Sequence, residues 1–150
     1  MLWKSLRLRR FLDVERIRLA IEDAERRTSS EIRVSVAPFF WGSVERAAER
    51  AFARLGMTST RARNGVLLFI VPSRHSFVVR GDAGIHERVP GDYWNALVRL
   101  MKPYFRRGEF TEGVLAGIQA LAEELSRYFP YDPLADRDEL PNAVDVPRRP

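Results

Sequence analysis

The sequence predicts an α/β domain built around a small mixed sheet, and three observations support that prediction. First, residues 66–71 are all apolar, which is typical of a strand covered on both faces. Second, a helical pattern lies between an earlier strand pattern and this one, so a right-handed crossover should make the two strands parallel. Third, the residues after Pro72 alternate between apolar and polar, which indicates an antiparallel hairpin partner.

Length and composition fit a single domain. A chain of 150 residues that is 45% hydrophobic and 30% charged is long enough to form a real core. No apolar run approaches the roughly 20 residues needed to cross a bilayer, and charged residues interrupt the N-terminus, where a secretory signal would be apolar. We therefore expect a cytoplasmic protein. The sequence has no cysteine, which excludes disulfides, thiolate metal sites and a cysteine nucleophile.

The net charge of +5 comes almost entirely from arginine. A predominance of arginine over lysine is typical of a codon-biased genome or of a high-temperature host, and also of phosphate recognition. We favour the first two origins and therefore expect a thermostable protein. Much of the excess positive charge lies in residues 1–10. The modest remainder does not indicate a nucleic-acid-binding face, so we expect no nucleic-acid partner.

Residues 1–10 form a basic arm in which Trp3 and three leucines alternate with four basic residues. This pattern is typical of a short amphipathic helix on an anionic membrane surface, so a peripheral membrane contact is one interpretation. The other is an arm whose Trp3 and Leu6 pack on the domain.

The first helix and the first strand follow the arm. Asp13 can cap a helix that runs to about Arg27, with an apolar stripe on one face. Residues 31–37 then alternate as a strand that Pro38 stops, with every second residue inward. The next loop contains three aromatic residues, 39–41, which are either a hydrophobic plug under the following helix or an exposed contact patch. We favour the plug.

The second helix leads into the central strand. Ser43 is a good cap for a helix over residues 44–55, and Gly56 should close it. The polar linker that follows brings Arg61 and Arg63 beside Asn64, at the start of the central strand.

The hairpin strand and two long helices complete the domain. Residues 76–80 form the antiparallel partner, which residues 81–84 end in a tight polar turn. A helix then begins at Gly91 or Asp92, and Pro103 should kink or end it. Residues 109–129 form the longest helix. We expect a domain over residues 11–129, followed by an acidic tail, 130–150, that has five prolines and is extended or disordered.

A metal site in this chain would have to be built from oxygen ligands, because the sequence offers few histidines. The sequence contains no phosphate-binding loop, dinucleotide fingerprint or His-Glu-x-x-His motif, and His75 and His86 are its only histidines. A metal would therefore be calcium or magnesium. The densest polar cluster holds Asp82, His86, Glu87 and Asp92 around glycines. Each residue also has a structural interpretation, as a turn residue, a helix cap or a solvated charge.

Six motifs occur in order along the chain: Thr28-Ser-Ser-Glu31-Ile-Arg-Val, Arg63-Asn-Gly-Val-Leu-Leu, Gly81-Asp-Ala-Gly-Ile-His86, Trp94, Phe105-Arg-Arg-Gly-Glu-Phe110, and Gly113 with Gly117-Ile118. Together they resemble the TPM domain, a family named for a thylakoid lumen protein, a photosystem II repair protein and a nematode modulator of acetylcholine receptors. The resemblance runs from about Phe11 to Pro130. It is to the short soluble bacterial branch, which lacks the signal peptide and membrane helix of many relatives.

The resemblance implies a three-layer α-β-α sandwich with a small mixed sheet. It also implies calcium binding, acid phosphatase activity as in the plant relative, or a role in assembling or repairing membrane complexes. Carried over by position, the polar site gathers Glu31, Asn64, Asp82 and Asp92 as metal ligands. Asn64 stands where many relatives have aspartate, which removes one charge.

Two functional hypotheses follow. The first is a divalent-cation-binding interaction or assembly module with an unidentified protein partner and no organic cofactor. The second is a metal-assisted phosphatase in which Asp82 and Asp92 hold the ion and His86 protonates the leaving group. Its phosphate would be bound by Arg61, Arg63 and Asn64.

Overall fold

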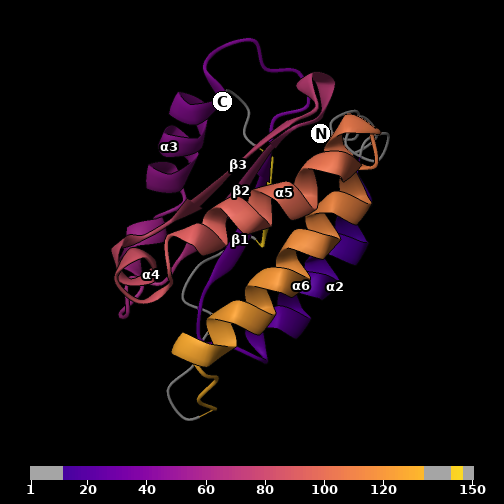
Figure 1. The fold of residues 1–150 in the computed structure, drawn as a ribbon. Coiled ribbons are helices and arrows are strands. Elements are labelled where there is room, and N and C mark those ends of the chain that lie inside the picture. The colour runs from indigo at the N-terminus through magenta and orange to yellow at the C-terminus, as the bar shows by residue number, and fades with distance from the viewer. Residues whose placement is uncertain (1–11, 134–142, 147–150) are drawn as a thin grey trace.

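The computed structural model describes residues 12–133 and 143–146, in which a four-stranded mixed sheet lies between helices (Figure 1). The elements in chain order are α2 (Val14–Glu25), β1 (Ile32–Val36), α3 (Val44–Arg54), η1 (Met57–Ser59), β2 (Val66–Val71), η2 (Pro72–Arg74), β3 (Ser76–Gly81), α4 (Ala83–Arg88), α5 (Asp92–Arg106), α6 (Phe110–Tyr128) and β4 (Val144–Asp145). The predicted α/β fold with a mixed sheet is confirmed.

The sheet has the strand order β3-β2-β1-β4. β1 and β2 are parallel, with Val34 opposite Leu68, and β2 and β3 are antiparallel, with Leu68 opposite Val79. The predicted crossover through α3 and the predicted hairpin are therefore both confirmed. Every residue of β2 has an exposed fraction of 0%, as expected for a strand covered on both faces.

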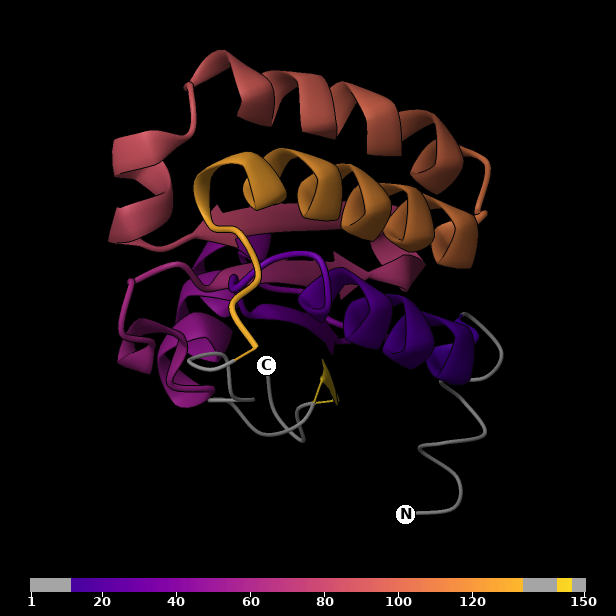
Figure 2. The same ribbon diagram turned by 90° about the horizontal axis from the view of Figure 1, so that it is seen from below.

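Alternate residues of the strands enter two separate cores. Ile32, Val34 and the even-numbered residues of β2 pack with α2, α5 and α6 in a first cluster, while the odd-numbered residues of β2 pack with α3 and Met57 in a second. Figure 2 shows α5 and α6 on one side of the sheet and α3 on the other. The two-residue period of the strands thus produces the three layers.

Two glycines of α6 let this helix lie against α5. A Cβ atom on Gly113 would come within 2.8 Å of the Phe105 ring, and one on Gly117 would come within 2.7 Å of the Met101 sulfur. At this separation of the helices a Cβ atom on Gly113 would overlap the Phe105 ring and Tyr104 Cβ, whereas one on Gly117 would require the Met101 side chain to move. These glycines are part of the last motif in which the sequence resembles the TPM domain.

Several predicted helix ends are confirmed. Asp13 accepts a hydrogen bond from Arg16 N at 3.2 Å, and Ser43 accepts one from Arg46 N at 3.2 Å. Gly56 closes α3 with φ of 67°, a left-handed conformation that favours glycine.

The prediction of a turn after β3 was wrong, and one of the two outcomes predicted at Pro103, the end of the helix, is excluded. The expected polar turn over residues 81–84 is the beginning of helix α4, because the Asp82 carboxylate caps it by accepting from Ala83 N at 2.8 Å. Pro103 does not end α5, which continues to Arg106. Pro103 is exposed, so its ring lies toward solvent and the helix loses one hydrogen bond there.

The aromatic loop between β1 and α3 is only partly a plug. Phe40 packs against the second cluster, but the exposed fraction is 48% for Phe39 and 86% for Trp41. The plug prediction therefore holds for one of three side chains. The other two form the exposed patch that was the alternative.

Part of the predicted extended tail forms a strand that the sequence did not predict. β4 pairs in parallel with β1, with Val34 opposite Val144 and Ser35 opposite Asp145. Predictions for residues 1–10, including the membrane contact, lie outside the described residues. Within residues 12–133 and 143–146, no helix combines the length and apolarity needed to cross a bilayer.

Candidate functional site

Four of the predicted site residues lie at one edge of the sheet because of the strand register. Val66 pairs with Ile32 on one side and with Gly81 on the other. The residues next to these partners are also bonded to the start of β2: Val66 N donates to Glu31 O at 2.8 Å, and Asp82 N donates to Gly65 O at 2.9 Å. Glu31, Arg63, Asn64 and Asp82 thus gather where β1 and β2 begin and β3 ends. We call these four residues the amino edge.

The Asp82 carboxylate is held by the guanidinium of Arg63. Arg63 Nε donates to Oδ2 at 2.6 Å and Nη2 donates to Oδ1 at 2.8 Å, a bidentate pair. Asp82 is 5% exposed, and the Arg63 side chain is 49% exposed. Arg63, followed by the Ala83 N–H, lowers the pKa of Asp82 against the opposing effect of burial. Asp82 is therefore an anion at neutral pH.

Helix α4 lies directly against the backbone that precedes Asn64. Gly84 N donates to Arg63 O at 2.8 Å, and a Cβ atom on Gly84 would come within 2.1 Å of Ala62 O. The chain at Arg63 has φ of 52°, which is uncommon for a residue with a side chain. This close approach sets the direction from which Arg63 reaches Asp82.

Asn64 is fixed by the segments on both sides of it. It is 2% exposed. Its backbone N–H donates to Thr60 Oγ1 at 3.1 Å, and its Nδ2 lies 3.4 Å from Ser29 Oγ. The side-chain amide therefore faces the turn before β1. Because β2 lies between β1 and β3, Asn64 lies between Glu31 and Asp82 along this edge of the sheet.

Glu31 belongs to a buried ion cluster that the sequence did not predict. Arg33, expected on a polar face, is 1% exposed. Its Nη2 lies 3.1 Å from Glu31 Oε2, and its Nη1 lies 2.8 Å from Glu25 Oε2. In a sheet covered on both faces, a strand arginine needs such carboxylate partners.

The remaining predicted residues are exposed. Arg61 lies in the linker, and Asp92 is the first residue of α5, a position that the helix dipole favours for an anion. His86 lies on α4 with its ring 5.9 Å from that of Trp94. Among the residues that the structure describes, no three His, Cys, Asp or Glu side chains are arranged to hold a metal ion.

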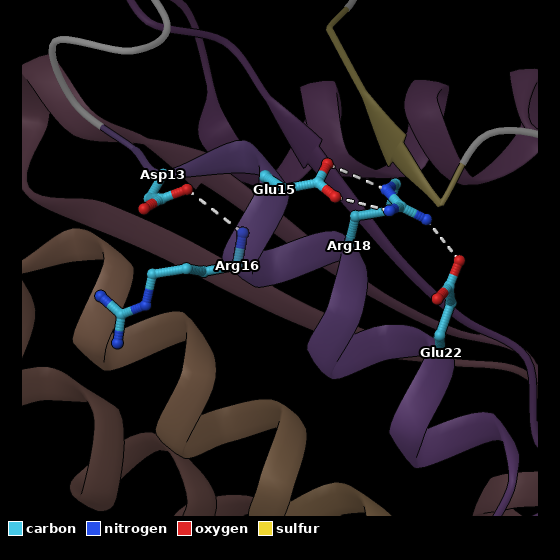
Figure 3. A network of polar contacts seen from close by, with 5 residues as sticks. All are labelled: Asp13, Glu15, Arg16, Arg18 and Glu22. Atoms are coloured by element: carbon cyan, nitrogen blue, oxygen red, sulfur yellow. Dashed lines mark hydrogen bonds and ion pairs between the residues drawn. The ribbon is translucent and has the colours of Figure 1, made fainter.

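An exposed charge network on α2 is explained by helix stability (Figure 3). Arg18 pairs with Glu15 at 2.6 Å and with Glu22 one turn further on, and Arg18 lowers the pKa of Glu15. These are pairs with i,i+3 and i,i+4 spacing on one helix. Arg16 reaches away to Glu112 on α6 at 2.9 Å. None of these groups lies at the amino edge.

A second group of polar residues was missed by the sequence. Asp145 of β4 accepts from Ser35 Oγ at 2.8 Å and from both terminal nitrogens of Arg54, at 3.1 and 2.6 Å. Ser35 lies on β1 and Arg54 on α3. The three residues are far apart in the sequence, so no spacing pattern could indicate the contact.

Comparison with known proteins gives one family and several solved structures. The family model described as the TPM domain matches residues 11–124. The BA42 protein of Bizionia argentinensis, solved by NMR, is 36% identical with a TM-score of 0.82, over 91% of this chain and 96% of that one. No curated protein sequence matches the chain.

Two further NMR structures share the fold at lower identity. The N-terminal domain of a P. gingivalis protein is 20% identical with a TM-score of 0.59, over 71% of this chain and 69% of that one. The N-terminal domain of a Corynebacterium glutamicum protein is 13% identical with a TM-score of 0.59, over 92% of this chain and 80% of that one.

Proposed function

The chain belongs to the TPM domain family, and on that premise we propose that it is a binding module whose Asp82 carboxylate takes a divalent cation, calcium or magnesium, in exchange for Arg63. The bidentate pair between Arg63 and Asp82 is the observation that supports this proposal. A guanidinium that binds both carboxylate oxygens occupies the position in which a hard cation would bind the same oxygens.

The exposure of the two partners favours such an exchange. Asp82 is 5% exposed and stays ionised, whereas the Arg63 side chain is 49% exposed and loses little by turning into water. In the observed arrangement Arg63 blocks the carboxylate, so the residues fit a cation only after Arg63 has moved.

The other proposed ligands are supported to different degrees. Asn64 lies at the same edge as Asp82, and its amide oxygen is a ligand type that calcium accepts. Glu31 is already paired with Arg33 at 3.1 Å, and Asp92 is exposed at the start of α5. We therefore propose Asp82 and Asn64 as the principal ligands and Glu31 and Asp92 as secondary ones.

The exchange would link cation binding to a protein partner. When the cation replaces Arg63, the guanidinium becomes available to a carboxylate or phosphate group on another molecule. This is how we propose that the domain serves in interaction or assembly: the cation changes the charge that the amino edge presents.

Calorimetric titration with calcium chloride tests the exchange. Arg63→Ala removes the competing guanidinium and should raise the calcium affinity by about tenfold or more, while Asp82→Asn should abolish binding. Arg61→Ala is the matched control, because Arg61 is an exposed arginine two residues away, and it should leave the affinity unchanged. Equal affinity of the wild type and Arg63→Ala, or binding retained in Asp82→Asn, would contradict the proposal.

Phosphomonoester hydrolysis is the second candidate function, and the position of His86 favours it. His86 lies on α4, where its backbone N–H donates to the backbone carbonyl of Asp82 at 3.3 Å, so the residue that carries the exposed imidazole lies one helical turn after Asp82. With phosphate bound by Arg61 and Arg63, His86 could donate a proton to the leaving oxygen. Turnover of an aryl phosphate that His86→Ala and Asp82→Asn both abolish would support this function, and turnover equal to wild type would exclude these roles.

A further inference from the structure

The outer edge of β1 is occupied by a short segment of the chain's own tail. β4 has two residues against the five of β1, and pairs only with Val34 and Ser35. Val34 N donates to Ala143 O at 3.0 Å. The segment therefore covers the middle of the edge strand and leaves its two ends without a β4 partner among the described residues.

The contact of β4 with Ser35 and Arg54 is specific for a carboxylate. Asp145 accepts from Ser35 Oγ at 2.8 Å, and Arg54 adds two hydrogen bonds in a fork. Ser35 is fully buried, Asp145 is 9% exposed, and Asp145 raises the pKa of Arg54. A guanidinium fork matches both oxygens of a carboxylate and matches an amide less well.

Apolar side chains around Asp145 complete the contact. Ala143, Val144 and Val146 are partly buried against the first hydrophobic cluster. Backbone pairing, flanking aliphatic side chains and one carboxylate together define what this edge binds. It is an extended segment in which an acidic residue follows an aliphatic one.

We propose that the β1 edge, with Ser35 and Arg54, is a docking site for such an acidic segment of a partner protein, and that residues 143–146 occupy it until the partner displaces them. A partner strand that pairs with all of β1 would form more backbone hydrogen bonds than the two-residue β4 does. The positive charge of Arg54 complements the acidic residue. The inference rests on the interaction-module part of the proposed function and not on the cation site.

Fluorescence anisotropy with the full chain tests this docking site. The probe is a labelled peptide with the sequence of residues 141–147, Pro-Asn-Ala-Val-Asp-Val-Pro. Asp145→Asn weakens the hold on the chain's own tail, so this variant should bind the peptide at least about tenfold more tightly than wild type. A peptide with Asn in place of its Asp should bind it at least about tenfold more weakly.

Two further variants assign the contact to Arg54. In the Asp145→Asn background, Arg54→Ala should abolish peptide binding, whereas Arg46→Ala, at the other end of α3, should leave it unchanged. The Asn peptide gives the same information without a change in the protein, in case Arg54→Ala impairs folding. Hydrogen exchange at the Val34 amide should become faster in Asp145→Asn, because this amide donates to Ala143.

Three results would overturn the inference. These are no binding of the Asp peptide to Asp145→Asn, equal binding of the Asp and Asn peptides, or a wild-type dimer that Asp145→Asn converts to monomer, since a second copy would then be the occupant. Titrations with EDTA and with calcium separate this site from the cation site. If the peptide does not bind but Arg63→Ala still raises the calcium affinity, only the docking site is rejected. If the peptide binds but Arg63→Ala does not raise the calcium affinity, only the cation site is rejected.

Discussion

Gly84→Ala is the substitution whose effect follows most directly from the geometry of the amino edge. The new Cβ atom would lie 2.1 Å from Ala62 O and 2.7 Å from Arg63 O, where ordinary contact begins at 3.4 Å. Both atoms belong to the backbone and cannot rotate away. Helix α4 must therefore move by about 1 Å or more relative to the linker.

The expected loss of stability combines three contributions. Overpacking of this kind costs about 1–3 kcal/mol, and the hydrogen bond from Gly84 N to Arg63 O contributes about 1 kcal/mol. Alanine's higher helix propensity returns up to about 1 kcal/mol. The net destabilisation is then about 1–3 kcal/mol, which lowers the Tm of a chain of this size by roughly 3–10 °C.

Thermal denaturation followed by circular dichroism measures this loss. Gly91→Ala is the matched control, because no atom lies within 4 Å of its added Cβ and its φ of −61° suits alanine. It should change the stability by less than about 1 kcal/mol. If Gly84→Ala is as stable as Gly91→Ala, the close approach of α4 to the linker is wrong, and so is the reason given for the direction of Arg63.

Three other predictions concern the core, the aromatic loop and pH. Leu68→Ala, at a fully buried position of the central strand, should cost about 2–5 kcal/mol in chemical denaturation, and a loss below about 1 kcal/mol would contradict the two-faced core. Trp41→Ala should change stability by less than about 0.5 kcal/mol because the side chain is 86% exposed. The pKa of Asp82 is lowered below its ordinary 3.8 in the folded state, so the unfolded chain binds the proton more tightly and the stabilisation present above about pH 4 is lost as the pH falls. Urea denaturation between pH 2 and 6 should therefore show that the free energy of unfolding falls less at low pH for Asp82→Asn than for wild type. Equal dependence of this free energy on pH in the two proteins would contradict the ion pair between Arg63 and Asp82.

The sheet could be predicted because its signal is local. The uninterrupted apolar run of β2 and the alternation in β3 lie within single elements, and the crossover rule then fixes the direction of β1. β4 could not be predicted in the same way. Val144 and Asp145 lie in a proline-rich tail without periodicity, and their pairing depends on Ser35 and Arg54, which come from distant elements.

The candidate site was predicted as a set of residues and not as an arrangement. Asp82, Asn64 and Glu31 were expected at strand ends, and the strand register brings these strand ends to one edge. The pair between Arg63 and Asp82 was not expected, because it depends on α4, and the glycines around Asp82 indicated a turn. Capping by Asp82 and the close contact at Gly84 outweighed the low helix propensity of glycine.

Arg33 was misjudged for a related reason. An alternating strand normally has one solvated face, and the alternation in β1 was interpreted in that way. The three-layer fold covers both faces, so the polar positions of β1 are buried and must find partners in Glu25, Glu31 and Asp145. Glu31 is only two residues from Arg33, but Glu25 lies on α2 and Asp145 on β4, so only the tertiary structure brings these two partners to β1.

The central claim, that a divalent cation replaces Arg63 at Asp82, is tested most directly by amide NMR of the ¹⁵N-labelled wild type during titration with calcium chloride. We predict saturable shifts concentrated at Arg63, Asn64 and residues 81–84, together with a change in the Arg63 Nε–H signal as its hydrogen bond to Asp82 is lost. Calcium up to about 10 mM exceeds the dissociation constants of weak calcium modules. An unchanged Arg63 Nε–H signal, or shifts located only elsewhere on the domain, would contradict the claim.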